Sequence, residues 1–117
     1  MSKDKNKAYL IHIIESIDLI DVHLSLLKNG EPWFRHPTVR EAVLRTLQVM
    51  AESCQRISED MKAQAPKVEW GKISGFRNFL VHEYLGDMDY SAVSTVIHRE
   101  LPELKQYISN LYTQNYP

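Results

Sequence analysis

The sequence predicts an all-α fold, an antiparallel four-helix bundle in which the last helix is kinked or broken. Apolar residues recur at intervals of three or four in four long segments, and no segment shows the alternation typical of a strand. Short connections containing proline or glycine separate the segments, which favours antiparallel neighbours. We expect a single helical domain over residues 1–117, because this length supports one core but not two.

The first helix is expected from about Asp4 to Lys28. Asn29 and Gly30 are typical of a left-handed stop, and Pro32 and Pro37 prevent the helix from continuing. Its apolar positions follow helical spacing, with acidic residues on the other faces. These positions are Leu10, Ile13, Ile14, Ile17, Ile20, Leu24 and Leu27.

The second helix is expected to begin at Thr38, because Thr38 and Glu41 have the spacing of a capping box. It should end near Ala65 and Pro66. One apolar stripe runs along it, formed by Val43, Leu47, Met50, Cys54, Ile57 and Met61.

The third helix is expected from Trp70 to Tyr84 or Leu85, closed by Gly86. Gly75 lies inside it, although a glycine within a helix costs roughly 1 kcal/mol relative to alanine. This position predicts the close approach of another backbone, such as that of a second subunit.

The fourth helix is expected to start from a cap at Asp89 or Ser91. Pro102 removes one helix hydrogen bond, so we expect a kink or restart between His98 and Pro102. The end of the helix should fray after Tyr112. Its apolar stripe comprises Val93, Val96, Ile97, Leu101, Leu104, Ile108 and Leu111.

Composition limits the functional classes. Apolar residues make up 44% of the chain and charged residues 25%, as in soluble globular proteins. The formal net charge of -1 gives no overall positive field, so any contact with nucleic acid must come from a local patch. No apolar run approaches the roughly 20 residues of a membrane span, and the first residues lack the apolar segment of a secretory signal. Together with the single cysteine, Cys54, these features predict a cytoplasmic protein.

Neither a metal nor a cofactor is expected. His12, His23 and His98 are scattered without the short spacing of a metal site, and Cys54 lies on the apolar stripe of the second helix. Near the first loop, aromatic and basic residues could contact single-stranded RNA, namely Trp33, Phe34, Arg35, His36 and Arg40. Anchoring of the loop by Trp33 and Phe34 is the favoured interpretation.

Four polar residues interrupt the apolar third helix: Arg77, Asn78, His82 and Tyr84. A guanidinium group binds phosphate oxygens through several donors, and histidine exchanges protons near neutral pH, so the pair suits phosphodiester cleavage. On a regular helix, Tyr84 projects within about 20° of Arg77, whereas His82 is displaced by about 140°. Arg77 and His82 would therefore converge only if the helix loosens near its end or if two copies of it pair across a dimer axis.

A structural interpretation of the same residues remains open. Arg77 could pair with Glu83 or a distant acid, His82 could be a hydrogen-bonded core histidine, and Tyr84 could cap the bundle. For any one of these residues taken alone, this interpretation is the favoured one.

Taken as a set, the four residues resemble the motif of HEPN-domain ribonucleases. In particular, they resemble that of HepT, the toxin partner of MntA-type nucleotidyltransferase antitoxins. The most specific part is R-N-F-L-V-H-E-Y at residues 77–84. The resemblance extends over most of the chain, through the long first helix, the Trp-containing connector, the acidic turn and L-P-E-L in the last helix.

The resemblance implies a helical bundle that forms a homodimer, with an RNA-cleaving cleft built from the arginine and histidine of both subunits. Carried to this chain, the catalytic residues are Arg77 and His82, with Asn78 positioning a side chain or a phosphate. The implied reaction is metal-independent, with the RNA 2'-hydroxyl as nucleophile, His82 in proton transfer and Arg77 stabilising the phosphate. Tyr84 corresponds to the acceptor of AMP from the antitoxin, and the added negative charge would repel RNA and occupy Arg77.

The predicted function is therefore an RNA endonuclease toxin of a toxin–antitoxin pair. Its expected partners are RNA, an MntA-type nucleotidyltransferase antitoxin and a second copy of the chain, with no membrane. The alternative is a non-catalytic helical adaptor that binds a nucleotidyltransferase and retains the motif for assembly.

Overall fold

Helices account for most of the chain. The computed structural model describes residues 2–117, with side chains from Lys5 onward, and it contains no strand in that range. No helix of the described part combines the length and apolar composition needed to cross a membrane. The elements are α1 (Ser2–Leu24), η1 (Trp33–Arg35), α2 (Pro37–Arg56), α3 (Glu59–Lys62), α4 (Trp70–Glu83), α5 (Tyr90–Thr95), η2 (Val96–Glu100) and α6 (Leu101–Asn115). The predicted all-α class is confirmed.

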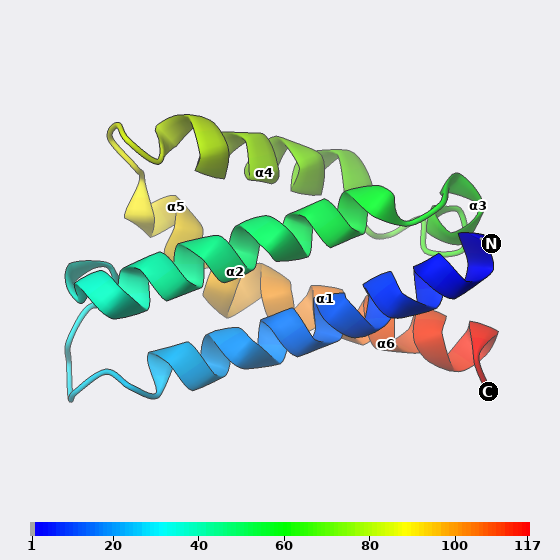
Figure 1. Ribbon diagram of the computed structural model, residues 1–117, viewed down its shortest axis with the longest axis horizontal. Helices are drawn as coiled ribbons and strands as arrows, with labels where there is room; N and C mark the ends of the chain where they lie inside the picture. Colours follow the sequence, from blue (N-terminus) through cyan, green and yellow to red (C-terminus); the bar gives the residue numbers. More distant parts are fainter. Residues whose placement is uncertain (1) are drawn as a thin grey trace.

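The long helices form a bundle with α2 at its centre. α2 packs against α1 on one side and α4 on the other, and α6 packs against α1 behind them (Figure 1). Neighbouring helices run in opposite directions, and the chain begins and ends at the same end of the bundle (Figure 1). Because α6 follows α5 and η2 along one path, the fourth helix of the bundle is a broken one.

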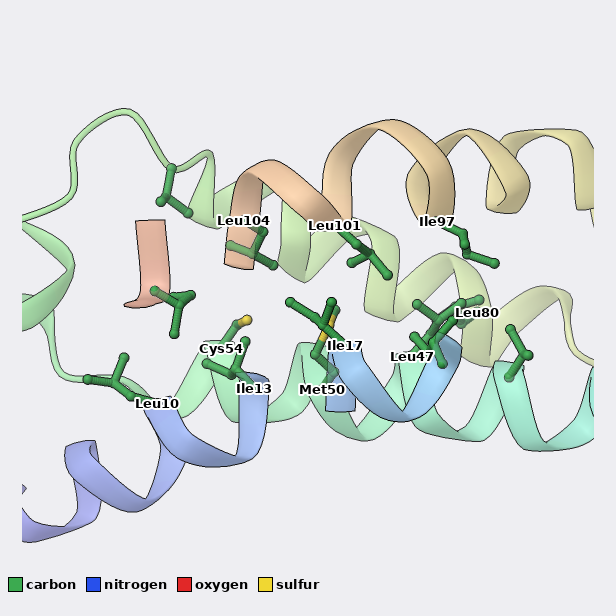
Figure 2. Packing of buried hydrophobic residues seen from close by; sticks show 14 of the residues in the cluster. Leu10, Ile13, Ile17, Leu47, Met50, Cys54, Leu80, Ile97, Leu101 and Leu104 are labelled. Carbon is green, nitrogen blue, oxygen red and sulfur yellow. The ribbon is translucent and has the colours of Figure 1, made fainter. Parts of the chain in front are cut away.

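The apolar stripes of the helices face the interior of the bundle and together form its core. Leu10 and Ile13 of α1, together with Leu47 of α2, have no exposed surface. Figure 2 shows these side chains meeting those of α4 and α6, including Leu80 and Leu104. Complete burial of such a side chain contributes about 1.5–3 kcal/mol relative to exposure, so the shared core is the main force that aligns the helices.

Cys54 belongs to this core (Figure 2). Burial raises the pKa of its thiol to about 12, because desolvation disfavours the thiolate. The thiol is therefore protonated at neutral pH and acts as a small apolar group.

The start of α2 differs from the expected one. α2 begins at Pro37, and His36 is the N-cap, since its Nδ1 accepts a hydrogen bond from the Val39 amide at 3.1 Å. The predicted start with Thr38 and Glu41 as a capping box is therefore wrong. Proline is favoured at the first position of a helix, which moves the cap to the residue before it.

The end of the second helix also differs. α2 stops at Arg56, because Ile57 takes an extended backbone conformation, and Ser58 then caps the short helix α3. Asn6 of α1 stabilises this break, since its side chain accepts from the Ser58 amide at 3.0 Å and donates to the Ser58 hydroxyl at 2.9 Å. The apolar spacing continues through the break, which explains why the sequence suggested one helix to Ala65.

Gly30 and Gly86, each predicted to end a helix, adopt different backbone conformations. Gly30 has φ of 73°, as expected of a left-handed stop, although α1 already ends at Leu24 and a turn follows it. Gly86 has no positive φ; its amide instead donates to the Glu83 carbonyl at 3.0 Å after α4. The expected span of the third helix, from Trp70 to Tyr84, agrees with α4 and its C-cap.

The predicted break in the last helix is confirmed. Asp89 caps α5 by accepting from the Ala92 amide at 3.1 Å, and η2 between α5 and α6 is π-helical. Within η2 the Leu101 amide donates to the Val96 carbonyl, five residues back, just before Pro102. Since Pro102 has no amide hydrogen to continue the regular pattern, the wider turn accommodates it. The expected fraying after Tyr112 is wrong, because α6 extends to Asn115.

A row of polar pairs joins α1 to α2. His12 shares a hydrogen bond with Ser53 at 2.6 Å, and His23 shares one with Thr46 at 3.0 Å. The Asn6–Ser58 pair, just beyond the end of α2, continues this antiparallel row. Both histidines therefore have structural roles.

Trp33 anchors the loop between α1 and α2. It is 5% exposed, and its Nε1 donates to the Ser94 hydroxyl at 2.9 Å. Phe34 stacks on Tyr90 with ring centroids 5.2 Å apart. These contacts confirm the interpretation of the aromatic residues as loop anchors.

Candidate nuclease site on α4

α4 presents its polar residues on different faces. Arg77 lies on the flank beside α2, with its side chain 34% exposed, whereas Asn78 and His82 are exposed on the outer face. α4 continues as a regular helix through Glu83, so Arg77 and His82 keep the separation of about 140° that helix geometry gives. Within one chain the two side chains therefore do not converge on one point.

Arg77 is paired with Glu52 of α2. Its Nε and Nη2 both donate to Oε2 of Glu52, at 3.4 and 3.3 Å, and Nη1 donates to Oδ1 of Asn78 at 3.3 Å. Of the two partners predicted for Arg77 in the structural interpretation, the distant acid is therefore confirmed, as Glu52, and Glu83 is wrong. Asn78 orients Arg77 rather than His82 in this arrangement.

Tyr84 is attached to α2 through a second carboxylate. Its hydroxyl donates to Oε1 of Glu41, while Arg40 Nε donates to the other oxygen of Glu41 at 3.2 Å. The hydrogen bond to Glu41 raises the pKa of Tyr84, and the negative charge of Glu41 adds to this effect. The same bond holds the pKa of Glu41 below its usual value. The Tyr84 ring is 51% exposed, so its hydroxyl remains accessible.

The Tyr84–Glu41 bond predicts an alkaline titration that is specific to Tyr84. The difference in phenolate absorbance between wild type and Tyr84→Phe should show ionisation above the ordinary tyrosine pKa of about 10. Because the folded pKa is raised, the bond stabilises the fold below pH 10 and loses this effect as pH rises through the folded pKa. Replacing Glu41 by glutamine should move the Tyr84 ionisation back toward pH 10. An unshifted Tyr84 in wild type would contradict the contact.

His82 is exposed and is not a core histidine. Among the side chains from Lys5 onward and the backbone of residues 2–117, no group forms a hydrogen bond or ion pair with its ring. The alternative in which His82 is a buried, hydrogen-bonded residue is therefore wrong. Its ring nitrogens are available to exchange protons with a bound molecule.

The outer face of α4 around Asn78 and His82 also carries two glycines, Gly71 and Gly75. A Cβ placed on Gly71 or Gly75 would meet no atom of the described chain within 4 Å. Val81, about 40° around the helix from Arg77, is 38% exposed, and Leu85, which follows α4, is 94% exposed. The close approach expected at Gly75 therefore has no counterpart within the chain, and a neighbouring backbone could reach this face only from another molecule.

The motif residues lie on open surface rather than in a cavity. A groove of about 430 Å³ runs between α4 and the η2–α6 segment, on the other flank of α4, with Phe76 and Tyr107 among its lining residues. None of the four motif residues lines it. In the described range, no cluster of three or more histidine, cysteine or acidic side chains is placed to hold a metal.

Sequence reasoning missed the role of the acidic residues of α2. Glu41 and Glu52 are eleven residues apart, which is about three turns, and so lie on one side of the helix. Arg45 and Gln48 lie between them at helical spacing and extend the same polar stripe. That stripe was the available signal, but only the packing of α2 against α4 shows that it faces Arg77 and Tyr84.

Over most of its length, the chain is similar to a ribonuclease family model and to proteins named as putative or probable ribonucleases. A family model described as Ribonuclease HepT-like matches residues 9–111. A Methanocaldococcus jannaschii protein named a "putative RNase" is 31% identical over 92% of this chain and 97% of its own length. A second one from the same organism is 30% identical over 91% and 86%. A Thermococcus cleftensis protein named "probable ribonuclease HepT" is 28% identical over 88% and 92%. No solved structure matches the chain significantly.

Proposed function

Because the chain belongs to the HepT-like ribonuclease family, we propose that it is a metal-independent endoribonuclease, the toxin of a toxin–antitoxin pair, with its site at Arg77, Asn78 and His82. The observation that carries this proposal is the exposed His82 ring, free of partners in residues 2–117, on the same helix as an arginine. Core packing has no need of such a histidine, whereas a solvent-accessible imidazole is well suited to proton transfer near neutral pH.

The site is completed by a second copy of the chain. A single helix keeps Arg77 and His82 on different faces, and the glycine-lined outer face of α4 leaves room for another helix. Pairing of two α4 helices about a two-fold axis would cover Val81 and Leu85 and bring two copies of the motif into one cleft. Association would therefore create the site as well as bury apolar surface.

In the proposed reaction, the RNA 2'-oxygen attacks the adjacent phosphorus and the 5'-oxygen leaves. His82 accepts the 2'-hydroxyl proton, or in its protonated form donates a proton to the leaving oxygen. Arg77 binds the phosphate and stabilises the charge that develops on its oxygens. The products are a 2',3'-cyclic phosphate and a 5'-hydroxyl.

The test is cleavage of a mixed RNA by the purified, unmodified protein in the presence of a chelator, with analysis of the product ends. Cleavage that persists without metal and leaves cyclic phosphate ends is expected. If a folded and dimeric preparation leaves the RNA intact, the alternative of a non-catalytic adaptor for a nucleotidyltransferase is favoured. The exposed side chains of Leu19 and Val22 on α1, with Leu26 just after the helix, would give such an adaptor an apolar face.

Tyr84 is the proposed acceptor of AMP from an MntA-type nucleotidyltransferase antitoxin. Its hydroxyl is accessible, and Glu41 is positioned to accept the phenol proton as the tyrosine oxygen attacks the α-phosphate of ATP and pyrophosphate leaves. The added phosphate would lie two helical turns from Arg77, beside the proposed path of the RNA. Repulsion of the RNA phosphates would then inhibit cleavage without a large conformational change.

Incubation with a cognate transferase and ATP is expected to raise the intact mass of the wild-type protein by adenylate units. Tyr84→Phe should abolish this gain, because it removes only the accepting oxygen. Tyr90→Phe is the matched control, since Tyr90 is partly buried against Phe34, and it should be modified like wild type. A mass gain that survives Tyr84→Phe would assign the modification to another residue.

A further inference from the structure

The donors of Arg77 are already engaged inside the protein. Nε and Nη2 point to one oxygen of Glu52 at 3.4 and 3.3 Å, and Nη1 points to Asn78. The two side chains are 34% and 30% exposed, so a ligand can reach the pair from solvent. A phosphate that binds Arg77 must therefore take over donors that are now directed at Glu52.

Glu52 is held in a charged state beside Arg77. Gln48 Nε2 donates to the same Oε2 at 3.3 Å, and this bond, followed by the pairing with Arg77 and the nearby Arg45, keeps the pKa of Glu52 below its usual value. At neutral pH the carboxylate both occupies the guanidinium and repels an approaching phosphate.

The Arg77–Glu52 pair has the geometry of a weak ion pair. Strong arginine–carboxylate bonds measure about 2.7–2.9 Å and use both oxygens, whereas both donors of Arg77 converge here on one oxygen at 3.3–3.4 Å. A partly exposed pair of this kind is weak, so a substrate that gains additional contacts can displace it.

We propose that Glu52 is a positioning residue that restrains Arg77 and competes with the RNA phosphate for it, a role that rests on the ribonuclease function proposed above. Arg77 then binds an isolated phosphate poorly and releases Glu52 only when other contacts, such as those of a second subunit, hold the RNA in place. The carboxylate thereby lowers the affinity for RNA that fits the cleft incompletely.

The test is RNA binding by Glu52→Gln, which keeps the shape of the side chain and removes its charge. The probe is a fluorescent RNA of roughly 12 nucleotides in which every ribose is 2'-O-methylated, so that it cannot be cleaved. We expect Glu52→Gln to bind roughly two- to fivefold more tightly than wild type, which is the factor a partly exposed ion pair is worth. With cleavable RNA, KM should fall by a similar factor and kcat should stay unchanged, because the restraint acts on binding.

Two controls isolate the role of Arg77. Glu15→Gln removes the same charge from the exposed face of α1 and should leave affinity unchanged. In an Arg77→Ala background, Glu52→Gln should give no gain, since the restrained group is gone. The proposed restraint would be wrong if Glu52→Gln bound RNA no more tightly than wild type. It would also be wrong if Glu52→Gln increased the affinity for RNA equally in the Arg77→Ala background. If instead Arg77→Ala alone binds and cleaves RNA as well as wild type, the proposed function of the motif is wrong.

Discussion

Replacing His82 by alanine is expected to lower the rate of RNA cleavage by about 100- to 10,000-fold, the range that a positioned acid or base contributes. Arg77→Ala should cost about 100- to 1,000-fold, as the loss of a group that stabilises transition-state charge does. Because His82 is exposed and unpaired in residues 2–117, its replacement should leave circular dichroism and the melting temperature unchanged. His98→Ala, which removes another exposed histidine, should keep wild-type activity. If His82→Ala also cleaved at the wild-type rate, the catalytic assignment would be wrong.

Mixing the two inactive variants tests whether the site is shared between subunits. A heterodimer of Arg77→Ala and His82→Ala chains retains one site in which the arginine of one chain meets the histidine of the other. With random pairing, half the dimers are mixed and one of two sites is intact, so about a quarter of wild-type activity should return. If Arg77 and His82 of the same chain act together, the mixture stays inactive.

Leu47→Ala is expected to destabilise the protein by about 2–5 kcal/mol. Leu47 has no exposed surface and lies beside Leu80 in the shared core (Figure 2), so its truncation would leave a cavity there. Such a loss is a large part of the 5–15 kcal/mol that stabilises an ordinary domain. Urea denaturation followed by circular dichroism measures the change.

Leu85→Ala is the matched control for this substitution. Leu85 is 94% exposed and follows α4, so its removal should change the free energy of unfolding of the monomer by less than about 0.5 kcal/mol. If the proposed dimer forms through α4, however, the same substitution should weaken association, which analytical ultracentrifugation would detect. A loss of less than 1 kcal/mol for Leu47→Ala would show that Leu47 is not central to the core.

The parts of the fold that depend on local pattern could be predicted from the sequence. The span of α4 follows from Trp70 and the apolar positions up to Tyr84, and the break in the last helix follows from the missing amide of Pro102. The break between α2 and α3 could not be predicted, because it is stabilised by Asn6, which lies 52 residues earlier in the chain. Apolar spacing alone does not report such a contact.

The site shows the same division between local and long-range information. That Arg77 and His82 lie on different faces of α4 follows from residue spacing and helix geometry. The partners Glu52 and Glu41 depend on which side of α2 meets α4, and this follows from how the two helices pack in the shared core. Sequence reasoning therefore identified the groups of interest but not the carboxylates that hold two of them.

The polar pairs between α1 and α2 carry a consequence for how the chain avoids misfolding. Apolar stripes are nearly periodic, so α1 could slide along α2 by one turn and still bury leucine and isoleucine. Such a slide would separate Asn6 from Ser58, His12 from Ser53 and His23 from Thr46 together. Each unpaired polar group left in the interior costs about 1–3 kcal/mol. The three pairs can all form in only one register of α1 against α2. That register also fixes the positions of Glu41 and Glu52 along α1.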